Sequence, residues 1–156
     1  MEKSAEVEAI SGQISLILSI VFLFAGGMVY VLFRPTSLLL FYWLDAIGLL
    51  EYVNEIRSSI TILLPQWVEY SLPDGLWVFS YSLCVGFIWS FDVKRCLPFL
   101  LLLPLVSVVD ECLQLFRLVP GTFDLCDLYA YLLASILGIS YVQLVNKIIK
   151  YYEKKS

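Results

Sequence analysis

The stretch Asp110–Gly138, DECLQLFRLVPGTFDLCDLYAYLLASILG, sets the arrangement of the rest of the chain. It places four carboxylates, a glutamine and an arginine between two apolar runs, Cys96–Val109 and Leu128–Asn146. The Pro120-Gly121 pair predicts a tight turn, so the two runs should pack as antiparallel helices. Ionisable groups at membrane depth are costly and usually face a bundle interior or a water-filled cavity. We therefore interpret this stretch as the candidate functional site.

Helical spacing gives each half of the stretch a polar face, because residues three, four and seven apart lie on one side of a helix. The first stripe comprises Ser107, Asp110, Gln114 and Arg117, with Glu111 about 60° round from Gln114. The second stripe comprises Asp124, Asp127, Tyr131, Ser135 and Gly138. We expect the two stripes to face each other across the hairpin.

This pattern resembles the VanZ-like family of small bacterial membrane proteins. The family signature reads roughly Glu-x-x-Gln, a Pro-Gly-Arg-like turn, and Asp-x-x-x-Asn-x-x-Gly-x-x-x-Gly. The matching positions are Glu111, Gln114, Pro120, Gly121, Asp127 and Gly138, while Thr122, Tyr131 and Ala134 replace the arginine, the asparagine and the first glycine. The resemblance covers less than a third of the chain and implies a role in envelope homeostasis or glycopeptide (teicoplanin-type) resistance.

A second part of the chain also bears on the resemblance. VanZ-like proteins often carry a His and a Tyr four residues apart in an earlier span. Here Trp77 and Tyr81 have that spacing without the histidine, and Asp74 is predicted to share their face. The resemblance therefore adds these residues to the candidate site.

The composition indicates an integral membrane protein. The 156 residues are 60% hydrophobic and 15% charged, with a mean hydropathy of +0.85, whereas soluble domains average about 25% charged residues. The chain has no histidine, which excludes His-based catalytic triads, HExxH zinc sites and haem ligation. It has no basic patch outside its C-terminal tail, so we do not expect a nucleic-acid partner.

We predict an all-α membrane protein, with residues 1–156 forming a single VanZ-like domain that is a bundle of four transmembrane helices. The expected spans are about 14–33, 75–91, 96–116 and 128–146. Between the first two spans, residues 34–73 should form a re-entrant or interfacial segment, since Thr36–Leu50 is only 15 residues long and contains Asp45. Met1–Gly12 lacks the basic region and the cleavage site of a signal peptide.

Lysines and arginines predict the orientation of these spans in a bacterial cytoplasmic membrane. The positive-inside rule places the Lys94-Arg95 loop and the lysine-rich tail in the cytoplasm. Both termini should then be cytoplasmic. The acidic stretch should lie at the outer leaflet and open toward residues 34–73.

The candidate ligand-binding residues are Asp74, Trp77, Tyr81, Asp110, Glu111, Gln114, Arg117, Asp124, Asp127 and Tyr131. With Arg117 as the only cation in the hairpin, its four carboxylates leave an excess of negative charge. Because like charges in a low dielectric disfavour one another's ionisation, we expect Glu111 to be protonated or to share a proton with Gln114. Such a site suits sugar hydroxyls, amines, or Mg²⁺ or Ca²⁺ bridging to a lipid phosphate, although no metal site is specific enough to predict.

Three functions remain open from the sequence. The first is a non-enzymatic envelope protein whose partners are membrane lipids and a lipid-linked cell-wall precursor or a glycopeptide. The second is a membrane enzyme that acts on a lipid headgroup through its carboxylates. The third is a small proton-coupled carrier, which ranks last because no inverted repeat is evident. The four cysteines are expected to be free thiols, with Cys112 and Cys126 the one pairing worth testing.

Overall fold

The structure is a computed structural model that describes residues 2–155, a range that contains helices and loops but no strand. The helices are α1 (Glu2–Phe33), α2 (Leu39–Ala46), α3 (Leu50–Ser59), α4 (Gln66–Tyr70), α5 (Leu72–Ile88), α6 (Val93–Leu115) and α7 (Leu125–Lys155). Within the described residues, α1, α6 and α7 are long and apolar enough to cross a membrane, and α5 is apolar but shorter, with 17 residues. The prediction of an all-helical protein with membrane-length apolar helices is confirmed.

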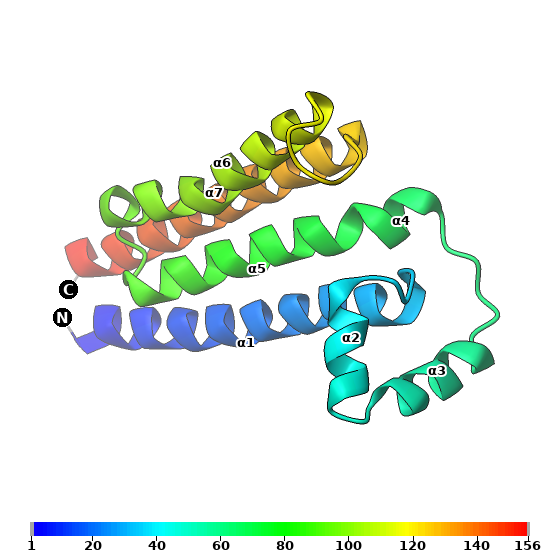
Figure 1. Cartoon of the computed structure of the whole chain (residues 1–156). Coiled ribbons are helices and arrows are strands. Elements are labelled where there is room, and N and C mark those ends of the chain that lie inside the picture. The colour runs from blue at the N-terminus through cyan, green and yellow to red at the C-terminus, as the bar shows by residue number, and fades with distance from the viewer. Residues whose placement is uncertain (1, 156) are drawn as a thin grey trace.

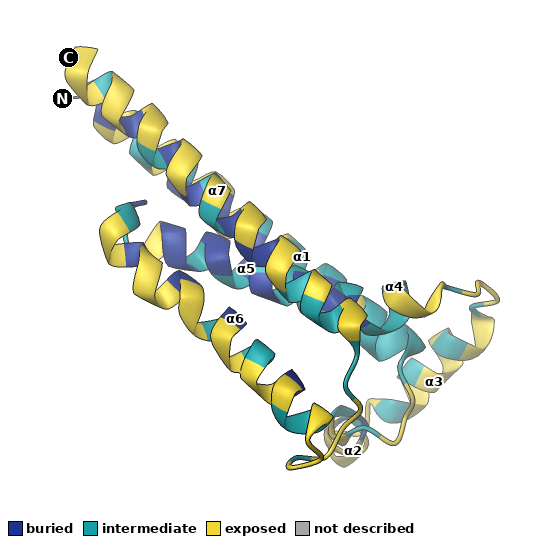
Figure 2. Ribbon diagram, turned by 90° about the horizontal axis from the view of Figure 1, so that it is seen from above, coloured by how far each residue is buried: buried dark blue, intermediate teal, exposed yellow. Residues whose placement is uncertain are grey.

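The four longest helices lie side by side and alternate in direction (Figure 1). Helix α5 is central, with α1 packed on one side and α7 on the other, while α6 packs mainly on α7. The two ends of the chain lie at one end of this bundle, and the α6–α7 turn and α2 to α4 lie at the opposite end (Figure 1). Buried residues concentrate on α5, whereas α1, α6 and α7 carry broad exposed faces (Figure 2).

Small and hydroxylated residues let α1 and α5 approach closely, as is common where membrane helices pack. Ser19 and Ser80 exchange hydrogen bonds, since Ser19 Oγ donates to the Ser80 carbonyl at 3.0 Å and Ser80 Oγ donates to the Ser19 carbonyl at 2.7 Å. Ser15 Oγ lies 2.7 Å from the Tyr141 hydroxyl and so joins α1 to α7. These contacts satisfy buried hydroxyls in an otherwise apolar interior.

The second predicted span ends earlier than expected. Helix α5 stops at Ile88, and Ser90 and Phe91 follow with positive φ angles of 49° and 57°. The prediction that the helix runs to Phe91 is therefore wrong. The reason lies in the next helix, where the Asp92 side chain accepts the backbone N–H of Lys94 and so caps the start of α6. The Phe91 side chain, only 1% exposed, folds back into the core.

The other boundaries show that helices extend beyond their apolar parts. Helix α1 begins at Glu2 rather than near residue 14, and α7 continues to Lys155 rather than ending near residue 146. Residues 34–73, predicted as a re-entrant or interfacial segment, contain α2, α3 and α4, each of ten residues or fewer. None of these three is long enough to cross a bilayer, which takes about 20 residues.

Tyr81 contributes to the packing of α5 against α6. Its hydroxyl donates to the Phe99 carbonyl at 2.8 Å. Replacing Tyr81 with Phe should therefore lower the free energy of unfolding by about 1 kcal/mol, the net value of one such hydrogen bond. Reversible unfolding of the detergent-solubilised protein would measure it. Tyr129→Phe, at a position 71% exposed, is the control and should change nothing measurable.

Candidate functional site

Polar side chains from four parts of the chain meet at the end of the bundle opposite the termini. Arg34 follows α1, Asp74 lies in the first turn of α5, Glu111 lies near the end of α6, and Asp127 and Tyr131 lie at the start of α7. The carboxyl groups of Glu111 and Asp127 and the Tyr131 hydroxyl all lie close enough to Asp74 to interact with it. We call these five residues the polar cluster.

Arg34 supplies the positive charge of the polar cluster. Its Nη2 lies 3.8 Å from Asp74 Oδ2 and donates a 2.8 Å hydrogen bond to the Tyr70 carbonyl. The guanidinium also stacks over the rings of Tyr30 and Tyr70, with 5.3 Å and 4.6 Å to the ring centroids. Arginine forms such planar contacts readily because its charge is delocalised and weakly hydrated. The side chain is thereby held in one position and is only 16% exposed.

Tyr70 is suited to this stacking because it stays neutral. A hydrogen bond with Glu69, reinforced by partial burial, raises the pKa of Tyr70 above its ordinary value. The phenol therefore keeps its proton at neutral pH. A neutral ring presents its electron-rich face to the guanidinium, which is the favourable arrangement for a cation–π contact.

Arg57 of α3 holds the backbone at the end of α1 in place. Its guanidinium donates to the carbonyls of Val31 and Arg34 and lies over the ring of Phe41, 5.2 Å from the centroid. The last carbonyls of a helix lack partners within that helix, and an arginine can satisfy them. Arg57 thus ties α3 to the end of α1 and holds the backbone from which Arg34 projects.

Glu111 is the member of the polar cluster that joins α6 to α7. It is 4% exposed, and its Oε2 accepts the backbone N–H of Asp124 at 3.1 Å. Asp124 in turn accepts the N–H of Cys126 at 2.8 Å, so it caps the start of α7. Gln114 donates instead to Asp110, at 2.8 Å. The alternative in which Glu111 shares a proton with Gln114 is therefore not found, while the expected protonation of Glu111 stays a prediction.

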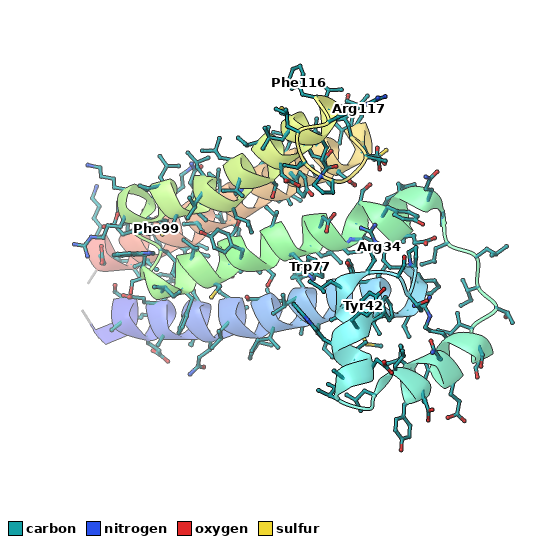
Figure 3. The ribbon with its side chains drawn as sticks, viewed as in Figure 1. Arg34, Tyr42, Trp77, Phe99, Phe116 and Arg117 are labelled. Carbon is teal, nitrogen blue, oxygen red and sulfur yellow. The ribbon has the colours of Figure 1, made fainter. Side chains whose placement is uncertain are left out.

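Two members of the first predicted stripe turn away from the interior. Asp110 and Arg117 are exposed, and Arg117 lies at the outer tip of the hairpin while Arg34 lies beside the start of α5 (Figure 3). Among the described residues the ion pairs are Arg34–Asp74 and Arg95–Asp92, so the prediction that Arg117 is the compensating cation is wrong. Turning Glu111 inward turns Asp110 outward, because adjacent helical residues are about 100° apart.

The stripe on α7 contacts α5 as well as α6. Tyr131 interacts with Asp74, and Gly138 lies directly against the Ser82 side chain. Ser135 Oγ donates to the carbonyl of Tyr131 on its own helix. The predicted turn is present, with Gly121 at φ 137°, a conformation that favours glycine.

Trp77 and Tyr81 lie away from the polar cluster and have packing roles. Trp77 Nε1 donates to the Leu23 carbonyl at 3.3 Å, and its ring lies 5.5 Å from that of Tyr30. Tyr81 contacts Phe99 of α6 as described above. Asp74, Trp77 and Tyr81, which were predicted to share one face of the helix, therefore contact different neighbouring helices.

Three buried side-chain atoms in the described part of the chain have no hydrogen-bond partner: Arg34 Nε, Ser71 Oγ and Asp127 Oδ1. Arg34 and Asp127 belong to the polar cluster, and Ser71 immediately precedes α5. Buried polar atoms in folded proteins are nearly always paired, so orphaned ones need an explanation such as a missing ligand or water. Two hydrogen-bond donors, Arg34 Nε and Ser71 Oγ, and one acceptor, Asp127 Oδ1, are thus available at one end of the bundle.

The acidic residues do not form a metal site in this arrangement. Over residues 2–155, no three Asp, Glu or Cys side chains come close enough together to hold an ion. All four cysteines are free thiols, Cys112 and Cys126 among them.

Comparisons of the chain with protein-family models, curated proteins and solved structures found no match.

Proposed function

We propose that the chain is a VanZ-like integral membrane protein that binds a lipid-linked or cell-wall-related ligand at its polar cluster. The observation that carries this proposal is the pair of unpartnered buried atoms, Arg34 Nε and Asp127 Oδ1, in a cluster that also contains the Arg34–Asp74 ion pair. Its biological setting is envelope homeostasis or glycopeptide resistance, as the sequence resemblance implies.

In this proposal α1, α5, α6 and α7 all cross the bacterial cytoplasmic membrane. Helix α5 has 17 residues, which at about 1.5 Å each give about 26 Å, close to the roughly 30 Å of a bilayer core. Lys94 and Arg95, in the first turn of α6, lie at the same end as both termini, and the positive-inside rule makes that end cytoplasmic. The polar cluster is then on the outer side.

The segment α2–α4 lies on the outer membrane surface in this arrangement. Tyr42 and Trp43 of α2 are 66% and 60% exposed, and Trp67 of α4 is 57% exposed. Aromatic rings of this kind accumulate at the headgroup level of a bilayer. The segment would therefore rest in the interface beside the polar cluster.

The charges of the cluster favour a particular ligand chemistry. One guanidinium lies beside Asp74, whose carboxyl group also interacts with those of Glu111 and Asp127. A free anion would be repelled by this excess of carboxylates, whereas hydroxyl or amino groups would donate to Asp127. Arg34 Nε can at the same time donate to a ligand oxygen. Sugar hydroxyls and amines, both common in cell-wall precursors, meet these requirements.

Native mass spectrometry of gently extracted protein tests this proposal. We expect the wild type to retain a bound species that Asp127→Asn and Glu111→Gln lose by about tenfold or more, which corresponds to about 1.4 kcal/mol. Asp45→Asn is the matched control, because Asp45 is an exposed carboxylate on α2 and should leave retention unchanged. The proposal fails if the four proteins retain the same species equally, or retain none.

An enzyme that acts on a lipid headgroup is the second candidate, favoured by the proximity of Glu111 and Asp127 to Asp74. Neighbouring carboxyl groups can divide the roles of general acid and general base. The same variants separate the two functions. An enzyme would keep its ligand in Asp127→Asn and lose turnover, whereas a binding protein would lose the ligand.

A further inference from the structure

An apolar groove of about 530 Å³ lies against α5 and α7. Its walls include Phe22 of α1, Phe79 of α5 and Leu133 and Leu137 of α7. Pockets that bind small ligands have volumes of roughly 300–1,000 Å³ and mainly apolar linings. The groove is therefore large enough to hold part of a ligand.

The groove is open on the lipid-facing side of α7. Leu133 and Leu137 are 60% and 51% exposed, although both belong to a helix that is apolar enough to cross a membrane. In a bilayer, hydrocarbon chains rather than water surround such residues. A lipid chain can thus enter the groove sideways without passing through water.

One end of the groove lies at the start of α5 and α7, the helix turns that also carry Asp74 and Asp127, although neither carboxylate lines it. Gly75 and Cys126 line the groove and directly follow or precede Asp74 and Asp127 in the chain. Ser71 also lines it, is only 3% exposed, and has a hydroxyl without a partner. An apolar channel that ends at unsatisfied hydrogen-bonding groups has the polarity of a membrane lipid.

We infer that the ligand is a membrane lipid with one hydrocarbon chain in this groove and its headgroup at Ser71, Asp74 and Asp127. This inference rests on the proposed function and names the class of its ligand. Asp127 Oδ1 requires a headgroup with an N–H or O–H donor, and Arg34 Nε can donate to a phosphate oxygen. An ethanolamine or a sugar headgroup has such donors, whereas a choline headgroup has none.

The test is native mass spectrometry of delipidated protein titrated with dioleoylphosphatidylethanolamine and dioleoylphosphatidylcholine. These lipids have the same chains and the same net charge, but only the first carries N–H donors. We expect the wild type to bind the ethanolamine lipid about tenfold more tightly. Ser71→Ala should weaken that binding roughly three- to tenfold, the effect of one lost hydrogen bond. Glycerophosphoethanolamine, the headgroup without chains, should bind at least tenfold more weakly than the whole lipid.

A matched pair of variants tests the groove itself. Leu133→Trp should fill the groove and weaken binding of the ethanolamine lipid about tenfold or more. Leu132→Trp adds the same bulk at the adjacent position, which is 52% exposed but does not line the groove, and should bind as the wild type does. Equal melting temperatures of the two variants would establish that neither change disturbs the fold.

Each alternative outcome overturns the inference in a recognisable way. Equal lipid binding by Leu133→Trp and Leu132→Trp would remove the groove as the chain site. If Asp127→Asn still abolished binding in that case, the proposed function would stand without the groove. Equal affinity for the headgroup without chains would reject a lipid. A wild-type dimer that Leu133→Trp converts to a monomer, with lipid binding unchanged, would instead make the groove an interface between two copies.

Discussion

Arg34→Met should lower the free energy of unfolding by about 3 kcal/mol. Removing one partner of a buried ion pair costs about 3–5 kcal/mol because the other charge is left uncompensated. We take the lower end because the Arg34 and Asp74 side chains are 16% and 20% exposed. The substitution also removes the hydrogen bond to the Tyr70 carbonyl and two stacking contacts. Unfolding in mixed detergent micelles, followed by circular dichroism, would measure the change.

Arg117→Met is the control for this result, since both changes remove one arginine at the same end of the protein. Arg117 is exposed and has no ion pair among the described residues, so its loss should cost less than about 0.5 kcal/mol. Adding Asp74→Asn to Arg34→Met should restore stability, with a coupling of about 1–3 kcal/mol. Equal destabilisation by the two arginine variants would show that Arg34 does not hold the polar cluster together.

The sequence identified most of the residues that form the polar cluster but not how they pair. Asp74, Glu111, Asp127 and Tyr131 were all predicted site residues, because charges beside apolar runs are informative about membrane proteins. Helical periodicity determines which residues share a face. It does not determine which neighbouring helix that face meets, so the packing of the α7 stripe on α5 was missed.

Arg34 is the member of the polar cluster that sequence reasoning missed. Arg34 directly follows the first predicted span, and Asp74 lies 40 positions later in the chain. Only the return of α4 and α5 toward the end of α1 brings the two together, and no local pattern encodes that return. One signal was available: an arginine at a predicted outer membrane boundary, where the positive-inside rule disfavours it, needs another reason to be there.

The helix ends were also beyond what hydropathy could predict. An apolar window marks the part of a helix that suits lipid, whereas the helix continues for as long as its residues favour the conformation. Glutamate, alanine and lysine extend α1 and α7 beyond their apolar parts.

Gly26→Leu should unfold the bundle or destabilise it by about 3 kcal/mol or more, whereas Gly27→Leu, one position along, should be tolerated. A Cβ at position 26 would lie 2.6 Å from Trp77 Nε1 and 3.0 Å from the Pro73 carbonyl oxygen. Overpacking of this kind typically costs 1–3 kcal/mol, and more where backbone must move. A Cβ at position 27 would meet nothing within 4 Å, and removing a helical glycine can add up to about 1 kcal/mol.

The consequence of Gly26→Leu should extend to the polar cluster, since Pro73 directly precedes Asp74. Moving the start of α5 away from α1 would separate Asp74 from Arg34, so ligand retention should fall together with stability. Trp77→Ala in the Gly26→Leu background should recover only part of the loss, because the clash with the Pro73 carbonyl remains. Unfolding measurements and native mass spectrometry on both glycine variants give the two readouts. Equal stability of Gly26→Leu and Gly27→Leu would contradict the close packing of α1 on α5, and with it the mechanism that places Arg34 beside Asp74.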